Sequence, residues 1–160
     1  MSETALKTLD ELVIELPSWG FADTGTRFGK FLQDGAAIDT KDKFSDAAEV
    51  HKVSGCCPKV AVHVLWDFTE EEPPSKVAEM AKGLGVEVGS INTNTFQDQI
   101  YKLGSFGNPD PEIRNAALQH CLESIRQGQE VGSRAVTYWM ADGTNYPGQD
   151  SIRGRKQRFE

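Results

Sequence analysis

The sequence has no long hydrophobic run, and this absence excludes one class of protein at the outset. A helix that crosses a membrane needs about 18 or more consecutive apolar residues, and no stretch of the 160 residues approaches that length. The first residues, Met1 to Lys7, also lack the apolar segment of a secretory leader. The sequence therefore predicts a protein that is neither secreted nor inserted in a membrane.

Positive charge is scarce as well. The 17 lysines and arginines face 24 aspartates and glutamates, which gives a formal net charge of -7. Binding to nucleic acid phosphates needs Lys and Arg clustered on one face. The basic stretch from Arg153 to Arg158 is interpreted as a solvated helix face, because the chain around it is acidic. We expect no nucleic-acid partner, and a small neutral or cationic ligand fits this charge better.

Cysteine is too rare for a disulfide framework. Only three are present, and Cys56 and Cys57 are adjacent, a spacing at which cysteines seldom pair with each other. No CxxC or Cys/His repeat accompanies them, so a soft-metal site at Cys-Cys-Pro is the minor alternative. Buried, inert thiols in a reducing cytoplasm are the main interpretation.

Three common enzyme signatures are missing too. Gly83-Leu-Gly85 does not extend to GxGxxG, and no GxxxxGK[ST] occurs, so nothing supports a nucleotide-phosphate cradle. A nucleophilic triad of the hydrolase type lacks its GxSxG elbow.

What the chain does contain is a regular alternation of strand-like and helix-like segments. With 38% hydrophobic and 26% charged residues, it has the balance of one globular domain. Apolar and β-branched runs predict strands at residues 12–16, 59–66, 86–92 and 135–141. Helical spacing predicts helices from Thr40 or Asp42, after Pro73, after Pro109, and from Gln149 or Asp150. Such alternation builds a parallel sheet, either doubly wound or closed into a barrel.

The last predicted helix stops at Glu160, before its apolar stripe is complete. Four β/α units are half of an eight-unit barrel, and an open half exposes two sheet edges. We therefore expect a fold of α/β class in which residues 1–160 are the amino-terminal half of a single TIM (β/α)8 barrel domain, cut off before the rest. The long segment between the first strand and the first of these helices, residues 20–40, is interpreted as a contact arm or lid.

The predicted strands end in residues suited to a ligand site. Trp19, Trp66 and Trp139 each follow the carboxyl end of a different predicted strand. Any one of them is as well explained as a core residue. Together they predict an aromatic wall, which suits a carbohydrate because its C–H faces pack on aromatic rings while its hydroxyls need fixed polar partners.

His63 and two aspartates are the other candidates. A lone histidine on an apolar strand is usually a satisfied core residue, but His63 lies at the strand end, beside Trp66 and Asp67. We predict that it serves a sugar oxygen, with Asp67 fixing its tautomer. Asp142 follows the fourth predicted strand, where it either binds substrate or bonds its own turn. A divalent metal site built from His63 and the two aspartates is a minor alternative, because the spacing of ligands is poor.

Six motifs, in order, carry a family resemblance. They are Glu15-Leu-Pro-Ser-Trp-Gly-Phe21, Thr24-Gly-Thr-Arg-Phe28, Ala61-Val-His-Val-Leu-Trp-Asp67, Ile91-Asn-Thr-Asn-Thr-Phe-Gln-Asp98, Tyr101-Lys-Leu-Gly-Ser105 and Ala141-Asp-Gly-Thr-Asn-Tyr-Pro-Gly-Gln149. From about Leu12 to Arg158 the chain resembles the bacterial L-rhamnose isomerases of the broad-specificity type, which are xylose-isomerase-like barrels.

The resemblance implies an aldose–ketose isomerase that interconverts L-rhamnose and L-rhamnulose and depends on a divalent metal, preferably manganese. It implies a role in ring opening for His63, pocket-wall positions for Trp66 and Trp139, and an intact protein that forms a homo-tetramer. Phe28 matches an aromatic residue that the long first loop lends to a neighbouring subunit.

The resemblance also has a gap. In that family the metal ligands and the catalytic lysine come from strands five to eight, so we expect no metal ligand in this chain and no turnover by it alone. Two alternatives stay open: a related barrel acting on another sugar, such as a ketose epimerase, and a non-catalytic half-barrel that closes by dimerising.

Overall fold

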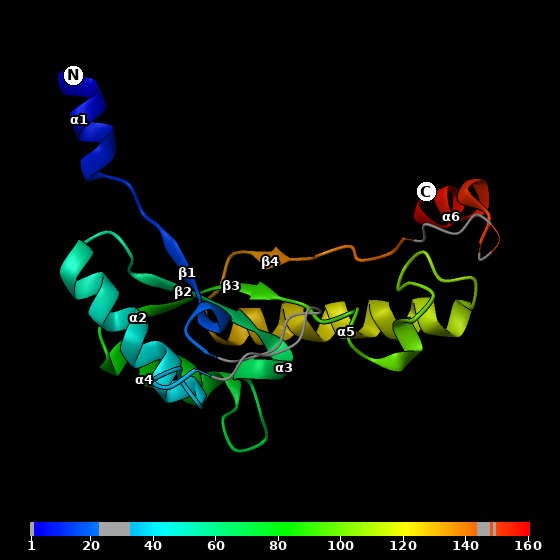
Figure 1. Cartoon of the computed structure of the whole chain (residues 1–160), viewed down its shortest axis with the longest axis horizontal. Coiled ribbons are helices and arrows are strands. Elements are labelled where there is room, and N and C mark those ends of the chain that lie inside the picture. The colour runs from blue at the N-terminus through cyan, green and yellow to red at the C-terminus, as the bar shows by residue number, and fades with distance from the viewer. Residues whose placement is uncertain (1, 23–32, 144–147, 149) are drawn as a thin grey trace.

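A computed structural model describes residues 2–22, 33–143, 148 and 150–160. Figure 1 shows a parallel sheet with helices packed on one face and a helix projecting at each end. The strands are β1 (Glu15–Pro17), β2 (Lys59–His63), β3 (Glu87–Asn92) and β4 (Val136–Thr137). They lie side by side in the order β1-β2-β3-β4, all parallel. A doubly wound sheet reverses its strand order, and these four strands do not. Among the described residues the sheet is open, with β1 and β4 at its edges.

The helices between the strands follow the predicted alternation. Helix α2 (Thr40–Ser54) joins β1 to β2, α4 (Pro74–Gly83) joins β2 to β3, and α5 (Pro111–Glu130) joins β3 to β4. Short helical turns follow the first three strands: η1 (Ser18–Gly20), α3 (Val64–Asp67) and η2 (Gln99–Tyr101). Helix α1 (Glu3–Asp10) precedes the sheet, and α6 (Ile152–Phe159) ends the chain.

One hydrophobic core lies between β2 and β3 and the helices that cover them. Phe44 and Ala47 from α2 meet Val60 and Val62 from β2, and all four side chains are fully buried. Helix α4 contributes Val77 and Ala81, and β3 contributes Val86, Val88 and Ile91. Helix α5 approaches so closely at Gly128 that a Cβ there would lie 3.2 Å from Ile91. Burial of this set fixes which face of the sheet the helices cover.

Strand β3 contains one more residue than β2 over the same stretch. Val60 lies beside Val88, but Val62 lies beside Ile91, so two steps along β2 match three along β3. This bulge resets the side on which the later β3 residues point, because alternate strand residues face opposite ways. His63 and Asn92 become neighbours as a result.

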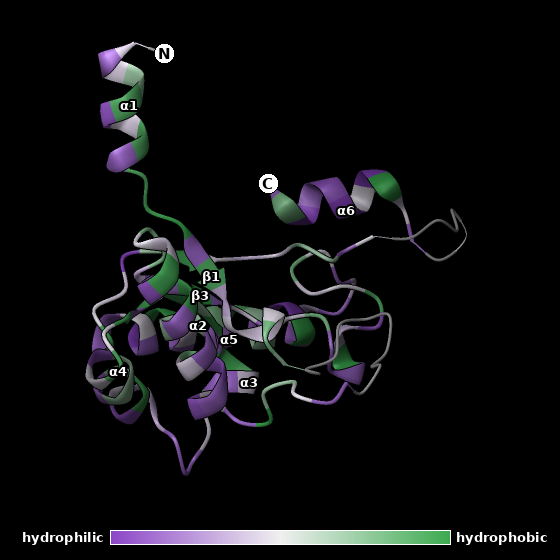
Figure 2. Ribbon diagram, turned by 60° about the vertical axis from the view of Figure 1, so that its left-hand side comes forward, coloured by the Kyte–Doolittle hydropathy of each residue, from purple (hydrophilic) through white to green (hydrophobic). Residues whose placement is uncertain are grey.

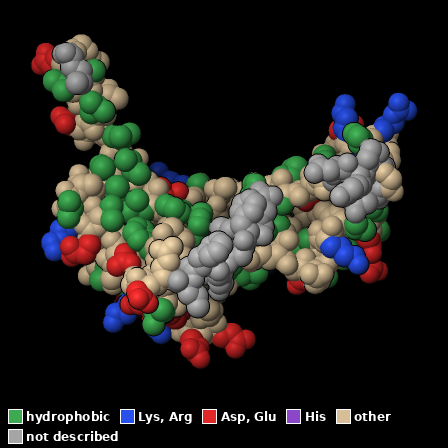
Figure 3. All heavy atoms as spheres, viewed as in Figure 1, with side chains coloured by type: hydrophobic (Ala, Val, Ile, Leu, Met, Phe, Trp, Pro, Cys, Tyr) green, Lys and Arg blue, Asp and Glu red, His purple; other side chains and the backbone are tan. Residues whose placement is uncertain are grey.

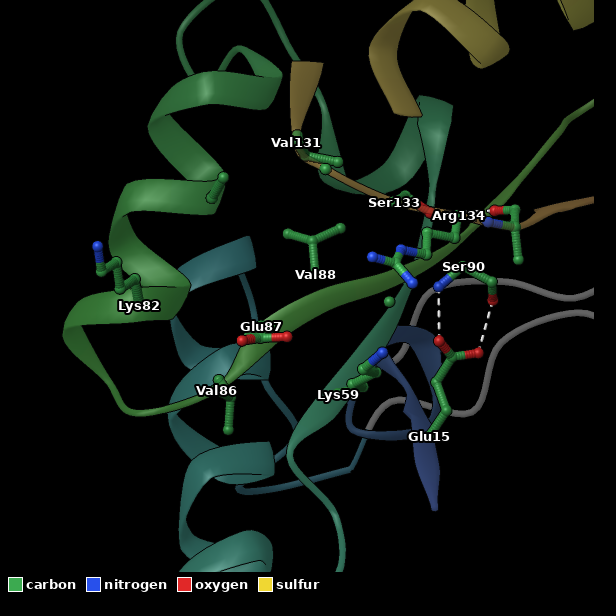
Figure 4. A pocket seen from close by; sticks show the side chains of 14 residues that line it. Glu15, Lys59, Lys82, Val86, Glu87, Val88, Ser90, Val131, Ser133 and Arg134 are labelled. Carbon is green, nitrogen blue, oxygen red and sulfur yellow. Dashed lines mark hydrogen bonds between the residues drawn. The ribbon is translucent and has the colours of Figure 1, made fainter. Parts of the chain in front are cut away.

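A carboxylate from β1 occupies the bulge. Glu15 reaches across β2 and accepts hydrogen bonds from the Ser90 backbone N–H at 2.5 Å and from the Ser90 hydroxyl at 2.6 Å (Figure 4). A Cβ at position 89 would lie 1.9 Å from the Glu15 Oε1, so a larger residue there would displace this carboxylate. One side chain therefore links β1 to β3, in addition to the ladders that pair both strands with β2.

Several predicted boundaries were wrong, for local reasons. The first strand begins at Glu15, not at Leu12, because the Leu12 N–H donates back to the Leu9 carbonyl in α1 at 3.2 Å. Ile14 donates to the Cys56 carbonyl at 2.8 Å, just before the pairing with β2 begins. The second ends at His63, where α3 begins. Helix α2 is capped by Asp39, whose carboxylate accepts the Asp42 N–H at 2.8 Å.

The carboxyl-terminal elements differ in the same way. The fourth strand covers only Val136 and Thr137 of the predicted 135–141, because its neighbour β3 ends at Asn92 and leaves nothing to pair with. The last helix starts at Ile152 and is capped by Ser151. Helix α1 was not predicted; it stands away from the sheet and buries none of its residues (Figures 1 and 2).

Candidate functional site

Four aromatic side chains and one histidine meet at the carboxyl ends of the strands. We call this set the aromatic cluster; its members are Trp19, His63, Trp66, Phe96 and Trp139. The His63 ring lies flat on Trp66 with centroids 3.6 Å apart and planes inclined by 14°. Trp19 meets both rings edge to face at 6.1 Å. Phe96 continues the cluster from His63, at 5.9 Å, to Trp139, at 4.9 Å. Three of the four strand ends therefore contribute a predicted tryptophan to one surface.

His63 is a buried polar ring without a hydrogen-bond partner. It is 4% exposed, and neither Nδ1 nor Nε2 has a partner within the described residues. Burial lowers the pKa of His63 from 6.5 to about 4; the nearby carboxylate of Asp67 opposes this shift, while His120 and Lys43 add to it. The ring is therefore neutral at physiological pH, with one nitrogen able to donate and the other able to accept. A buried polar group in this state is costly unless something completes its hydrogen bonds.

Asp67 makes no hydrogen bond to the His63 ring, contrary to the prediction that it fixes the tautomer. Its carboxylate accepts the backbone N–H of His63 at 2.7 Å, the hydroxyl of Ser18 at 2.6 Å and the ammonium of Lys43 at 2.9 Å. The residue is fully buried. With no exposed surface and three protein partners, Asp67 is placed to hold the backbone of the site and not to contact a substrate.

Side-chain amides border the aromatic cluster on the β3 side. The indole N–H of Trp66 donates to Gln97 Oε1 at 3.0 Å, and the Asn94 amide donates to the same oxygen. The backbone N–H of Asn94 donates to His120 Nε2 at 2.9 Å, which leaves that nitrogen unprotonated, and burial lowers the pKa of His120. These groups give the edge of the cluster fixed donors and acceptors.

Four residues of the site were not among the predicted site residues: Asn94, Phe96, Gln97 and His120. Phe96 and Gln97 follow β3 within the motif Asn94-Thr-Phe-Gln97, so their position after a strand is a usable signal. His120 lies in the middle of α5, at a helical spacing that carries no such signal. Thr95 is a further buried group here, and its hydroxyl lacks a partner among the described residues.

Asp142 lies beyond the cluster and holds a distant loop. Its carboxylate accepts the Ser105 N–H at 2.8 Å, the Ser105 hydroxyl at 2.6 Å and the Gly107 N–H at 2.6 Å. Tyr138 bonds the same serine hydroxyl. Asp142 thus ties the segment after β4 to the loop before α5, a third arrangement besides the two that the sequence suggested. Phe28 and Asn145 lie outside the described residues.

The donors of this chain do not form a divalent metal site in the described ranges. No three His, Cys, Asp or Glu side chains there lie close enough to hold a cation. Asp67 is already saturated by protein donors, and Cys56 and Cys57 are free thiols with their sulfurs 3.8 Å apart. The described residues therefore do not fit the metal that the family resemblance implies.

A cavity of about 620 Å³ lies at the opposite, amino-terminal ends of the strands (Figure 4). Charged groups of both signs line it, among them Glu15, Lys59, Glu87 and Arg134. Glu15 is engaged with Ser90 there. The unpartnered His63 ring instead marks the carboxyl ends as the candidate site, the end at which parallel α/β sheets bind ligands. In the described part of the chain, no helix has the length and apolarity to span a bilayer.

An open, four-stranded parallel sheet with helices between its strands defines the class as an α/β chain, and its candidate site is the aromatic cluster at the strand ends. Known proteins narrow that class. A protein named as a probable sugar isomerase from Mesorhizobium japonicum is 33% identical over 156 residues, which cover 94% of this chain and 36% of that protein. One with the same description from Rhizobium meliloti is 34% identical over 151 residues, 91% of this chain and 35% of that protein.

A shorter match extends to xylose isomerase from Thermus thermophilus, 36% identical over 55 residues, or 34% of this chain and 14% of that enzyme. No family model matches the chain. The chain spans about a third of the length of the probable sugar isomerases that it matches. The predicted resemblance to sugar isomerases is thus confirmed, since the relatives are named as probable sugar isomerases.

Proposed function

We propose that this chain is the amino-terminal, sugar-binding part of a (β/α)8 sugar isomerase. The observation that carries the proposal is the buried, neutral and unpartnered His63 ring within the aromatic cluster. A sugar supplies what is missing there: a hydroxyl or ring oxygen to complete the hydrogen bonds, and C–H faces to pack on indole rings. The names of the relatives support the same substrate class.

The chemistry assigned to His63 follows from its charge. A neutral imidazole can donate one proton to a sugar ring oxygen and accept one from a hydroxyl, as ring opening of an aldose requires. Trp66 holds the ring in plane by stacking, and Asp67 fixes its backbone. Gln97 and Asn94 offer amide groups to further hydroxyls at the rim.

The finer parts of the proposal concern the whole protein. We propose L-rhamnose and L-rhamnulose as the sugar pair, manganese as the divalent ion, and a homo-tetramer as the assembly. Among the described residues no three potential ligands lie close enough to hold the ion, and we propose that its ligands lie on residues outside this sequence. A barrel isomerase or ketose epimerase with another preferred sugar is the nearest competitor, and the short match to xylose isomerase makes xylose the comparison substrate.

Two experiments test the proposal. Titration of the 160-residue chain with L-rhamnose, D-xylose and a non-sugar polyol is expected to perturb tryptophan fluorescence for the sugars alone, because all three tryptophans lie in the aromatic cluster. The loss of this response in His63→Ala is expected. An isomerisation assay with manganese should detect no turnover by this chain. Equal responses to the polyol, or turnover at rates typical of isomerases, would contradict the proposal.

A further inference from the structure

A buried ion pair lies directly beneath the aromatic cluster. Lys43 of α2 and Asp67 of α3 approach to 2.9 Å, and their side chains are 3% and 0% exposed. The pair is not isolated, because both ends continue into hydrogen bonds with other segments. Charges buried this deeply are tolerated only when such bonds complete them.

The bonds of this pair end on the backbone segments that carry the rings. Lys43 Nζ also donates to the Trp66 carbonyl at 3.1 Å. The Asp67 carboxylate accepts hydrogen bonds from the His63 backbone N–H and from the hydroxyl of Ser18. Ser18 directly precedes Trp19 in the chain. One pair of charges therefore binds the backbone of His63 and Trp66, on one segment, and the hydroxyl of Ser18, next to Trp19 on another.

Helix α2 contributes a second attachment beside the first. The hydroxyl of Thr40 donates to the Asp67 carbonyl at 3.3 Å. Lys43 and Thr40 lie one turn apart, on the face of α2 that also buries Phe44 and Ala47. The helix thus connects the aromatic cluster to the hydrophobic core, and a shift of α2 would be transmitted to the rings.

A purely structural pair would have no need of these particular contacts. An apolar pair of similar volume often gives equal or greater stability than a buried salt bridge. The retained charges instead supply directional bonds to Ser18, His63 and Trp66, which apolar side chains cannot make. We propose that Lys43 and Asp67 are positioning residues, which set the relative placement of the Trp19, His63 and Trp66 rings for the sugar. The sugar part of this statement rests on the proposed function; the placement of the rings does not.

The test separates ring placement from stability. The double variant Lys43→Met, Asp67→Leu removes both charges together, so that neither is left buried alone. Because the three tryptophans of the chain all lie in the cluster, near-ultraviolet circular dichroism reports on it specifically. We expect the double variant to keep the far-ultraviolet spectrum of the wild type and to lose most of the tryptophan near-ultraviolet signal.

Two controls bracket this result. Lys52→Met breaks the Lys52–Glu49 contact, which has the same 2.9 Å length and lies on the same helix but is exposed at both ends. Val77→Ala weakens the core in α4 without touching the ion pair. Both are expected to keep the near-ultraviolet signal, and Val77→Ala shows whether a general loss of stability can imitate the effect.

Ser18→Ala keeps the inference testable if the double variant does not fold. It removes one hydroxyl from the network and should raise the accessibility of Trp19 to acrylamide in an otherwise native chain. Sugar affinity supplies the functional readout: the double variant should bind the responding sugar about tenfold more weakly or worse, because small misplacements of binding groups are costly. An unchanged near-ultraviolet spectrum in the double variant, or unchanged accessibility in Ser18→Ala, overturns the inference. A wild-type chain that binds no sugar overturns the proposed function alone.

Discussion

The imidazole of His63 lies flat against the indole of Trp66, at a centroid distance of 3.6 Å, while the backbone N–H of the same histidine is held by Asp67. Ring and backbone are thus fixed from different directions. Neither contact uses a ring nitrogen, and neither nitrogen has a hydrogen-bond partner in the part of the chain that the structure describes. The proposed function assigns these two nitrogens of a buried ring to a ligand.

The first prediction concerns pH. His63 has a pKa of about 4 in the folded chain, against an ordinary value of 6.5. As the pH falls, the unfolded chain therefore binds a proton at a higher pH than the folded chain does. Stability from this residue is complete above pH 6.5 and is lost as the pH falls towards 4. At about 1.4 kcal/mol for each pH unit between the two values, the loss reaches at most about 3 kcal/mol.

Urea unfolding of wild type and His63→Gln at pH values from 7 to 4, roughly the interval between the two pKa values, measures this effect. The wild type should lose stability more steeply than the variant over this range. NMR titration of the His63 ring should show its midpoint near 4. Parallel pH dependences for the two proteins would contradict the assignment.

The second prediction concerns Asp142. Asp142→Ala removes the acceptor of three hydrogen bonds and leaves Ser105 and Gly107 without it. We expect a loss of about 2 kcal/mol in the free energy of unfolding, because these are charge-assisted bonds in a partly buried setting. Asp98→Ala, which removes only the exposed cap of η2, should cost under about 1 kcal/mol. Equal losses would show that Asp142 is no more than a turn residue.

The third prediction concerns Gly89 and Glu15. Gly89→Ala places a methyl group where the Glu15 carboxylate lies, so the carboxylate must leave Ser90. The expected cost is about 1–2 kcal/mol, from the lost hydrogen bonds. In a Glu15→Ala background the same substitution should cost far less, since nothing is displaced. Chemical denaturation of the four proteins gives the coupling directly, and additive effects would disprove it.

The fourth prediction concerns the β4 edge. Val136 is 40% exposed on β4, and Trp139, two residues after this strand, is 43% exposed. Among the described residues β4 pairs with β3 alone. Exposed apolar edge strands pair with other chains, so the isolated chain is expected to self-associate at micromolar concentration. Val136→Lys should shift sedimentation velocity profiles towards the monomer. Val53→Lys, at a position 86% exposed on α2, is the control that should leave association unchanged.

Local patterns predicted the elements that are buried against a neighbour. The run Lys59–His63 and helix α5 were found because apolar, β-branched or helical spacing reflects the core that they form. The fourth strand was overestimated, since its length depends on where β3 ends and not on its own residues. Helix α1 contacts no core, and apolar spacing without burial was not recognised as a helix.

The candidate site, too, was predicted where a residue follows a strand and missed where distant segments pack together. The tryptophans could be placed because each follows a predicted strand, and parallel strands end on one edge. The partners of Asp67 could not be predicted, because Lys43 and Ser18 lie 24 and 49 residues away in the sequence. Only the packing of the fold brings them to Asp67. Pairing Asp67 with the nearest ionisable ring in the sequence gave the wrong contact.

The bulge in β3 constrains the number of residues between Val88 and Ile91 as tightly as their identity. Removal of one residue there would turn Asn92, and whatever continues its alternation, towards the opposite side of the sheet. In alignments of related chains, a gap at this point is therefore a change of site chemistry. The same one-residue gap in the loop between α3 and α4 would only shorten that loop.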